Sequence, residues 1–384
     1  MHFMVATLRN RAVGERCHLR AAFVIVLAVA LAGCASRPGP EVLAPVGMTA
    51  GIKTVPIFVA TTRKRAAPSE NVFTTERADT LNFAKFVVGI PPHHQPGNIE
   101  WSDGTPDPRL SFATIDQAVL SDAGFRSEVA PLSKTAGRRQ KRNVLIFVHG
   151  FNNNFQESLY RLAQISADSG YGASILFAWP SQANPVLYSE DKAAAAYSRD
   201  YLIELLTMVS DSPQVGEILL VAHSMGGMLT AEALGELRIR GRNRVIARLG
   251  RVVLAAPDID AAVFRSQVQA IGPLKPPLTV LVSKDDTALK LSSFIGGSIV
   301  RAGALDIDNP LVQEAAVKAQ VRVVDISQLP SPDGGMHHDR LFNFAVLYPQ
   351  VERRLAVDGQ KFGVFLFDAA TDKLIEVANP APAN

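Results

Sequence analysis

The sequence predicts an α/β fold, with a doubly wound, mostly parallel sheet and helices on both faces. Its continuous apolar runs lack the polar–apolar alternation of half-exposed strands, and strands of a parallel sheet have this pattern. Helical stretches separate these runs, as the crossovers between parallel strands require. With 47% hydrophobic and 20% charged residues among 384, the composition is that of a folded chain and excludes disordered, collagen-like and polytopic membrane proteins.

The predicted elements follow one another in a regular order. Strands are expected at residues 143–148, 173–179, 217–222, 251–256 and 278–283. Helices are expected between them at residues 157–167, 189–209 and 225–240. Residues 55–60 and 81–90 predict a β-rich beginning, and residues 362–368 and 373–377 predict a C-terminal hairpin.

The first 33 residues have the organisation of a secretory leader. Four arginines precede the apolar run at residues 21–32, which is too short for a membrane-spanning helix of about 20 residues. The run ends in Leu31-Ala32-Gly33-Cys34, which is similar to the lipobox of bacterial lipoproteins. That resemblance implies cleavage before Cys34, acylation of its sulfur and amine, and a membrane anchor in the bacterial cell envelope. Ala35, where that family can carry Asp, favours the periplasmic face of the outer membrane over the inner membrane.

The cysteines and charges limit the possible functions. Cys17 lies in the leader and Cys34 would be lipidated, so the mature fold is expected to have no disulfide, cysteine-rich zinc site or cysteine nucleophile. Beyond residue 33 the numbers of basic and acidic residues are equal, so the basic pI belongs to the leader. No nucleic-acid partner is therefore expected. His93 and His94 stand beside prolines and are interpreted as loop residues, and no metal site is predicted.

The strongest local signal is a serine between an apolar strand and a helix. Residues 219–222 run into His223-Ser224-Met225-Gly226-Gly227, a pattern that resembles the nucleophile elbow of the α/β-hydrolases, G-x-S-x-G. Ala222 replaces the first glycine of that pattern. The resemblance implies that Ser224 is the nucleophile and that the Met225 N–H faces the reaction centre. His223 and Gly226 are then residues that support the turn.

A second signal lies upstream, at the end of the strand at residues 143–148. His149-Gly150-Phe151 is similar to the His-Gly element of α/β-hydrolases, where the following backbone N–H helps to form the oxyanion hole. The resemblance assigns that N–H to Phe151, opposite Met225. It makes His149 and Gly150 structural residues of the loop.

An acid and a base are expected downstream of Ser224, in that order, because this is the order in the superfamily. Asp286 follows the strand at residues 278–283 and is the preferred acid, because Asp286-Thr287-Ala288-Leu289 resembles the D-x-A-L of relatives. Asp285 is the close alternative. Asp258 and Asp260 follow an earlier strand and also compete, although helix capping would explain them equally well.

The base must come from the pair of histidines beyond the acid. His337 and His338 follow two glycines in a predicted loop, which suits a histidine that is delivered to the end of the sheet. The spacing of His338-Asp339-Arg340 before an apolar run favours His338, and His337 is the alternative.

Residues 143–340 together resemble a largely uncharacterised, esterase- or lipase-like branch of the bacterial α/β-hydrolases. Further matches are found at residues 55–63, 149–155, 179–181 and 256–260. The expected organisation is a signal peptide at 1–33, a lipidated cysteine and tether at 34–53, and an α/β-hydrolase domain at 54–350. That domain has a lead-in at 54–142 and a catalytic core at 143–350, and a hairpin and tail follow at 351–384.

The resemblance implies a lipid-anchored serine hydrolase that acts on a small-molecule or lipid ester and needs no cofactor. Two other functions stay open at this point. One is a non-catalytic, envelope-binding lipoprotein that retains the scaffold, because a fold does not fix a function. The other is a peptidase or acyltransferase that uses the same three side chains.

Overall fold

The structure is a computed structural model that describes residues 37–132, 143–171, 173–295, 299–331, 335–344, 363–368 and 373–378. The predicted leader and Cys34 lie outside these residues. The chain forms two compact units, residues 1–41 and residues 42–384. The sheet and the α-helices of the described residues belong to the second unit.

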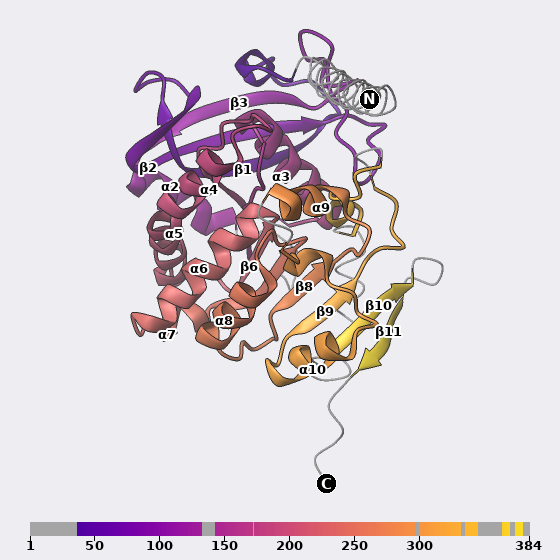
Figure 1. The fold of residues 1–384 in the computed structure, drawn as a ribbon. Coiled ribbons are helices and arrows are strands. Elements are labelled where there is room, and N and C mark those ends of the chain that lie inside the picture. The colour runs from indigo at the N-terminus through magenta and orange to yellow at the C-terminus, as the bar shows by residue number, and fades with distance from the viewer. Residues whose placement is uncertain are drawn as a thin grey trace, which may run out of the picture. The chain divides into compact units, whose positions relative to one another are not determined.

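An eleven-stranded sheet runs through the described part of this unit, in the order β11-β10-β9-β8-β7-β6-β4-β5-β1-β2-β3 (Figure 1). Its strands are β1 (Lys53–Arg65), β2 (Phe73–Ile90), β3 (Ala113–Leu120), β4 (Val144–Val148), β5 (Ala173–Ala178), β6 (Ile218–His223), β7 (Leu249–Ala255), β8 (Thr279–Val282), β9 (Arg322–Asp325), β10 (Gly363–Asp368) and β11 (Lys373–Ala378).

The helices are α2 (Asp122–Leu132), α3 (Phe155–Ser169), α4 (Tyr188–Tyr197), α5 (Arg199–Asp211), α6 (Met225–Ile239), α7 (Asn243–Ala247), α8 (Ala261–Ile271), α9 (Thr287–Ile295) and α10 (Pro310–Lys318). Short 3₁₀ turns are η1 (Pro40–Leu43) and η2 (Ala302–Ala304). None of the helices in the described ranges is long and apolar enough to cross a membrane.

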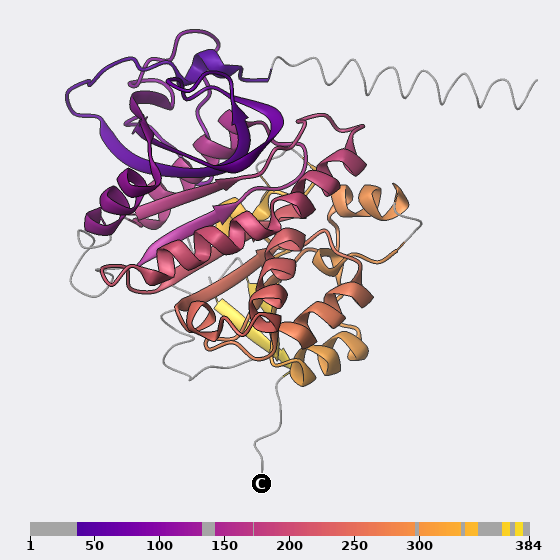
Figure 2. The same ribbon diagram turned by 90° about the vertical axis from the view of Figure 1, so that its left-hand side faces the viewer.

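The predicted fold class is confirmed. From β1 to β10 neighbouring strands pair in parallel, and the pairing becomes antiparallel only at the edges, in β1–β2–β3 and β10–β11. Helices pack against the sheet (Figure 2), and its two faces carry separate apolar layers. Along β4, Val144, Ile146 and Val148 face the layer that contains α5, α6 and α8, while Leu145 and Phe147 face the layer that contains α3.

The order of the strands shows where a site can form. β4 lies between β5 and β6, so the chain leaves β4 toward one side and returns on the other side. Loops at the carboxyl ends of strands diverge at such a reversal, and ligands of open α/β sheets bind there. His149 and Ser224 follow β4 and β6 at this point.

Several elements differ from the sequence prediction. The single helix expected at residues 189–209 is two helices, α4 and α5, separated at Ser198. The Ser198 hydroxyl lies 2.9 Å from the Ala194 carbonyl and 2.8 Å from the Thr62 hydroxyl, and such local bonds interrupt a helix. The apolar patterns did not predict β3, β9, α2, α9 or α10. The expected C-terminal hairpin is present as β10–β11, and β10 extends the main sheet by pairing in parallel with β9.

His94 lies in a loop, as expected, but both nitrogens of its ring contact carboxylates. Its Nδ1 lies 2.8 Å from Glu100 Oε2 and its Nε2 lies 3.0 Å from Asp168 Oδ1. Asp168 belongs to α3 and also accepts the Gly97 N–H. These two carboxylates raise the pKa of His94 despite its burial, and the cluster fastens the loop after β2 to α3.

Candidate active site

Ser224 occupies a strained turn between β6 and α6. Its backbone has φ 54° and ψ −121°, a conformation that costs free energy for any residue with a side chain. Three backbone hydrogen bonds hold it: the Ser224 N–H donates to the Ala255 carbonyl, and the Ser224 carbonyl accepts from Gly227 and Asp258. The turn is therefore fixed by both β7 and α6.

The glycines of the two sequence motifs permit close backbone packing around this turn. A Cβ on Gly226 would lie 2.3 Å from the His149 carbonyl oxygen, which no side chain can tolerate. A Cβ on Gly150 would lie 3.0 Å from both the Ser224 Cβ and the His223 Nδ1. The loop after β4 and the turn after β6 are thus in contact, although 73 peptide bonds separate Gly150 from His223 along the chain.

His338 and Asp286 form a close pair. The Nδ1 of His338 lies 2.7 Å from the Asp286 Oδ2, and because a carboxylate only accepts, Nδ1–H donates. Asp286 is fully buried and its other oxygen accepts the Leu289 N–H at 2.9 Å. Burial lowers the pKa of His338, but the hydrogen bond and charge of Asp286 outweigh it, so the pKa is raised. The second ring nitrogen, Nε2, can then accept a proton.

His223 links the nucleophile turn to the loop that carries His338. Its ring lies 4.6 Å from the His338 ring, centroid to centroid, and its Nε2–H donates to the His338 carbonyl at 3.1 Å. Burial first, and then the charge of His338, lower the pKa of His223 to about 4. A neutral His223 therefore positions His338 from the residue next to Ser224.

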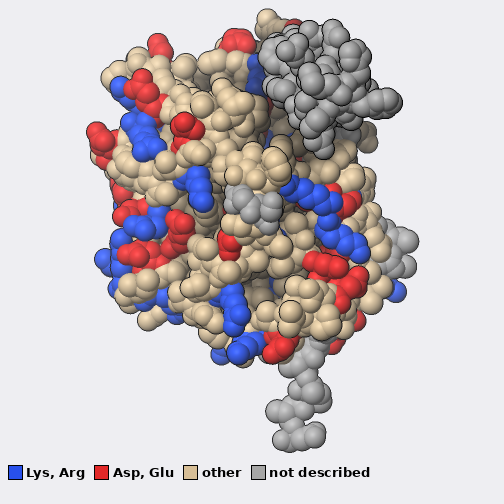
Figure 3. Space-filling view, viewed as in Figure 1, with Lys and Arg blue, Asp and Glu red and all other residues tan. Residues whose placement is uncertain are grey.

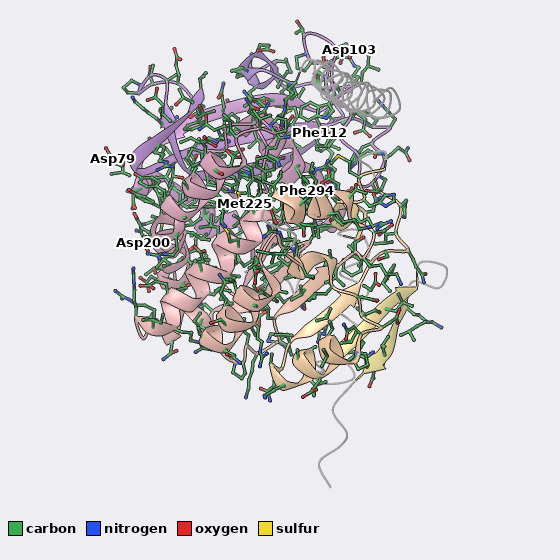
Figure 4. The ribbon with its side chains drawn as sticks, viewed as in Figure 1. Asp79, Asp103, Phe112, Asp200, Met225 and Phe294 are labelled. Atoms are coloured by element: carbon green, nitrogen blue, oxygen red, sulfur yellow. The ribbon has the colours of Figure 1, made fainter. Side chains whose placement is uncertain are left out.

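The two expected oxyanion donors lie at the ends of adjacent strands. Phe151 follows Gly150 after β4, and Met225 is the first residue of α6, where N–H groups point away from the helix (Figure 4). Residues missed by the sequence analysis fix the Phe151 loop. The carboxylate of Asp191, on α4, is fully buried and accepts the Asn152 N–H at 3.2 Å.

Asp191 and Arg63 hold this loop from two sides. Asp191 also accepts from the Ser181 hydroxyl at 2.5 Å and from the Gln182 N–H at 2.6 Å, so one carboxylate joins the loops after β4 and β5. Arg63, buried at the end of β1, donates to the Asn153 carbonyl at 3.1 Å. Desolvation lowers its pKa to about 10, against the charge of Asp191. Arg63 ends a segment that matched the hydrolases, but nothing in the sequence singled out Asp191.

His149 has a packing role. Its ring stacks on Trp179 with centroids 4.8 Å apart and planes at 14°, and its carbonyl accepts the Trp179 indole N–H at 2.8 Å. Burial, and then the charge of Arg63, lower the pKa of His149 to about 3. A ring that stays neutral at physiological pH and stacks on Trp179 holds the loop in place.

The alternative acid and base at the site lie against each other, and the acid also binds Arg340. Asp285 forms hydrogen bonds through both oxygens with Arg340, and its Oδ2 lies 2.8 Å from His337 Nδ1. The Arg340 hydrogen bond, followed by that of Ser283, holds the pKa of Asp285 far below its usual range. His337 has φ 62°, a left-handed conformation. His337 contacts Asp285 and the next residue, His338, contacts Asp286.

The two earlier aspartates have structural positions. Asp260 caps α8, where its Oδ1 accepts the N–H groups of Ala262 and Val263. Asp258 is buried in a polar network. Its carboxylate accepts from the Tyr188 hydroxyl at 2.9 Å and the Ser292 hydroxyl at 2.7 Å, and lies 3.2 Å from Arg301.

Among the described residues, no group of three or more His, Cys, Asp or Glu side chains is arranged so that it could hold a metal ion. The side chains brought together at the end of the sheet are the hydroxyl of Ser224, the imidazoles of His223 and His338, and the carboxylate of Asp286.

The fold and the two motifs define an α/β hydrolase. Residues 126–354 match the model of a family described as alpha/beta hydrolase of unknown function (DUF900), and the chain belongs to this family. Among solved structures it is similar to ESTFA in an Fe-lacking apo form, with 11% identity, a TM-score of 0.30, and 68% of this chain and 76% of that chain covered. It is also similar to the peroxisomal α/β-hydrolase Lpx1 of Saccharomyces cerevisiae, with 12% identity, a TM-score of 0.21, and 54% and 44% covered. No curated protein matches the sequence.

Proposed function

We propose that this protein is a serine hydrolase that cleaves carboxylic esters with Ser224, His338 and Asp286. The observation that carries the proposal is the 2.7 Å contact between His338 Nδ1 and the buried Asp286 carboxylate, beside the strained turn of Ser224. An activated serine needs a base to accept its proton and an acid to orient that base. The membership in a hydrolase family supports the same reaction class.

In the proposed reaction, the Ser224 hydroxyl attacks the ester carbonyl while His338 Nε2 takes its proton. The N–H groups of Phe151 and Met225 hold the oxygen that becomes negative, a contribution typically worth about 3 kcal/mol for each donor. His338 then protonates the departing alkoxide, which leaves as the alcohol, and an acyl ester remains on Ser224. Water, deprotonated by His338, releases the acid and restores the hydroxyl. Asp286 stabilises the imidazolium in both halves.

We also propose that the mature protein begins at an acylated Cys34 and is held at a membrane of the bacterial cell envelope. The lipobox pattern at residues 31–34 supports this anchor. Several acyl chains would hold the protein firmly, since each buried CH₂ contributes about 0.8 kcal/mol. The absence of Asp after the cysteine favours the periplasmic face of the outer membrane.

A fluorophosphonate probe tests the nucleophile, because it labels only activated serines. The wild-type chain should be labelled, Ser224→Ala should not, and His338→Ala should be labelled much more slowly. His337→Ala is the matched control and should be labelled at the wild-type rate. A folded wild-type protein that resists the probe would favour a non-catalytic, envelope-binding role, and labelling of Ser224→Ala would contradict the assignment of the nucleophile.

A further inference from the structure

Helix α9 exposes large apolar side chains beside the site. Leu291, Phe294 and Ile295 are 56%, 77% and 55% exposed, whereas Leu289 and Ser292 are buried. Side chains at positions i, i+3 and i+4 share one face of a helix, so these three form a continuous apolar surface. Figure 4 marks Phe294 on this helix. Single exposed apolar residues need no explanation, but a contiguous group of them does.

The apolar surface continues onto the neighbouring segments. The Ser293 hydroxyl donates to the Ile299 carbonyl at 2.5 Å, and the Val300 carbonyl accepts the Ala261 N–H at 3.0 Å. These bonds bring three more exposed side chains, Ile299, Val300 and Val263, to the same region. We call these six residues the α9 surface: Val263, Leu291, Phe294, Ile295, Ile299 and Val300. In Figure 3 tan side chains in the region of α9 are bordered by blue side chains of Lys and Arg.

The α9 surface is attached directly to the groups of the proposed reaction. α9 begins immediately after Asp286, which caps it through the Leu289 N–H. Farther along, the Ser292 hydroxyl donates to Asp258, whose N–H donates to the Ser224 carbonyl. The helix thus lies one residue from the proposed acid and two hydrogen bonds from the nucleophile.

Charge indicates what this surface contacts. α8 and α9 together contain two cationic residues, Arg265 and Lys290, both exposed, and no Asp or Glu. Lys290 lies four residues before Phe294, so a cation shares one face of α9 with apolar side chains, and this combination matches the edge of an anionic lipid bilayer, where acyl chains lie beneath negative headgroups. The surface of a water-soluble substrate would not need this combination.

We propose that the α9 surface docks on an anionic lipid bilayer, and that the substrates are lipid esters taken from it. This proposal rests on the proposed hydrolase function and specifies its substrate class. The proposed anchor agrees with it, because an acylated Cys34 would itself hold the protein at a membrane.

The test separates docking from chemistry. The full chain with Cys34→Ser, which removes the lipid, is mixed with vesicles of phosphatidylglycerol and phosphatidylcholine, and binding is measured by co-sedimentation. Hydrolysis is measured with a long-chain ester carried in those vesicles and with a monomeric, short-chain p-nitrophenyl ester. The double variant Leu291→Ser/Phe294→Ser removes the apolar face. Leu311→Ser is the matched control, because Leu311 is 73% exposed on the distant helix α10.

We expect the double variant to lose about tenfold or more of vesicle binding and of vesicle-ester turnover, since two apolar side chains no longer insert. Turnover of the monomeric ester should stay within about twofold in both variants, because neither changes the groups that react. Equal vesicle binding by wild type and double variant would overturn the docking proposal while leaving the hydrolase intact. So would a wild-type dimer that the double variant abolishes, since the surface would then join two copies. Vesicle binding without hydrolysis of either ester would instead contradict the proposed function.

Discussion

Two neighbouring histidine–aspartate pairs stand at the end of the sheet, and they differ in almost everything except distance. His338 meets Asp286 at 2.7 Å, and His337 meets Asp285 at 2.8 Å. The Asp286 side chain is fully buried, whereas that of Asp285 is 40% exposed. In the sequence, each aspartate adjoins the other, and each histidine adjoins the other.

The difference lies in what else each carboxylate binds. Asp285 faces the guanidinium of Arg340 through both oxygens, so its negative charge is already balanced by a permanent cation. Asp286 accepts a backbone N–H at one oxygen and His338 at the other. Only a carboxylate whose charge is not matched by a guanidinium can strongly stabilise an imidazolium. The partners of the acid, rather than the distance to it, therefore distinguish the two pairs.

The largest effect is expected from Asp286→Asn. An amide at this position no longer fixes the imidazole or stabilises its charged form, and kcat should fall by about 10³–10⁴-fold, as in other hydrolases with this arrangement. Hydrolysis of a short-chain p-nitrophenyl ester measures it, with circular dichroism as the control for folding. A loss below tenfold in a folded variant would mean that Asp286 is not the acid.

Asp191→Asn should have the next largest effect. Asp191 accepts three hydrogen bonds, from Asn152, Ser181 and Gln182, and an amide nitrogen in its place would face at least one donor. The displaced loop carries the Phe151 N–H, so kcat should fall about 10–100-fold while KM stays within about threefold. The exposed neighbour on the same helix, Glu190, offers the control Glu190→Gln. An equal loss in both variants would refute a positioning role for Asp191.

The pH dependence compares the two pairs directly. Asp286 raises the pKa of His338, so this histidine keeps its proton at a pH where an ordinary histidine, near 6.5, has lost half. Because the proposed base acts without that proton, kcat/KM should rise with pH through a midpoint above 6.5. In Asp286→Asn the residual activity should have its midpoint at a lower pH, because burial lowers the pKa of His338 and the carboxylate that raised it is gone. His337→Ala should leave the midpoint unchanged. A shifted midpoint in His337→Ala would mean that His337, and not His338, is the base.

The sequence predicted the parallel core because continuous apolar runs such as residues 144–148 have few alternatives to a buried strand. It also predicted Ser224 and Gly150, whose motifs reflect local constraints on the backbone. It could not predict Asp191 or Arg340, since the partners of a buried charge come from distant segments. Asp191 is 39 residues from Asn152, and Arg340 is 55 from Asp285. The sequence preferred Asp286 to Asp285 only through its resemblance to relatives, because the partner that distinguishes the two carboxylates, Arg340, lies far along the chain.

The smallest catalytic effect is expected from Asp285→Asn, which should change stability instead. Kinetically, kcat should stay within about threefold, because Asp286 and His338 are untouched. Arg340, which is nearly buried, would lose its anion but keep the Leu329 carbonyl, so the free energy of unfolding should fall by about 1–2 kcal/mol, a figure limited by the partial exposure of Asp285. Urea denaturation measures this difference.

The pKa of Asp285 is depressed in the folded state, so its contribution to stability is present above the unfolded value, about 3.9, and is lost as pH falls below it. The difference in free energy of unfolding between wild type and variant should therefore be largest near pH 7 and should shrink below pH 4. A gap independent of pH would mean that the Asp285–Arg340 ion pair does not stabilise the fold.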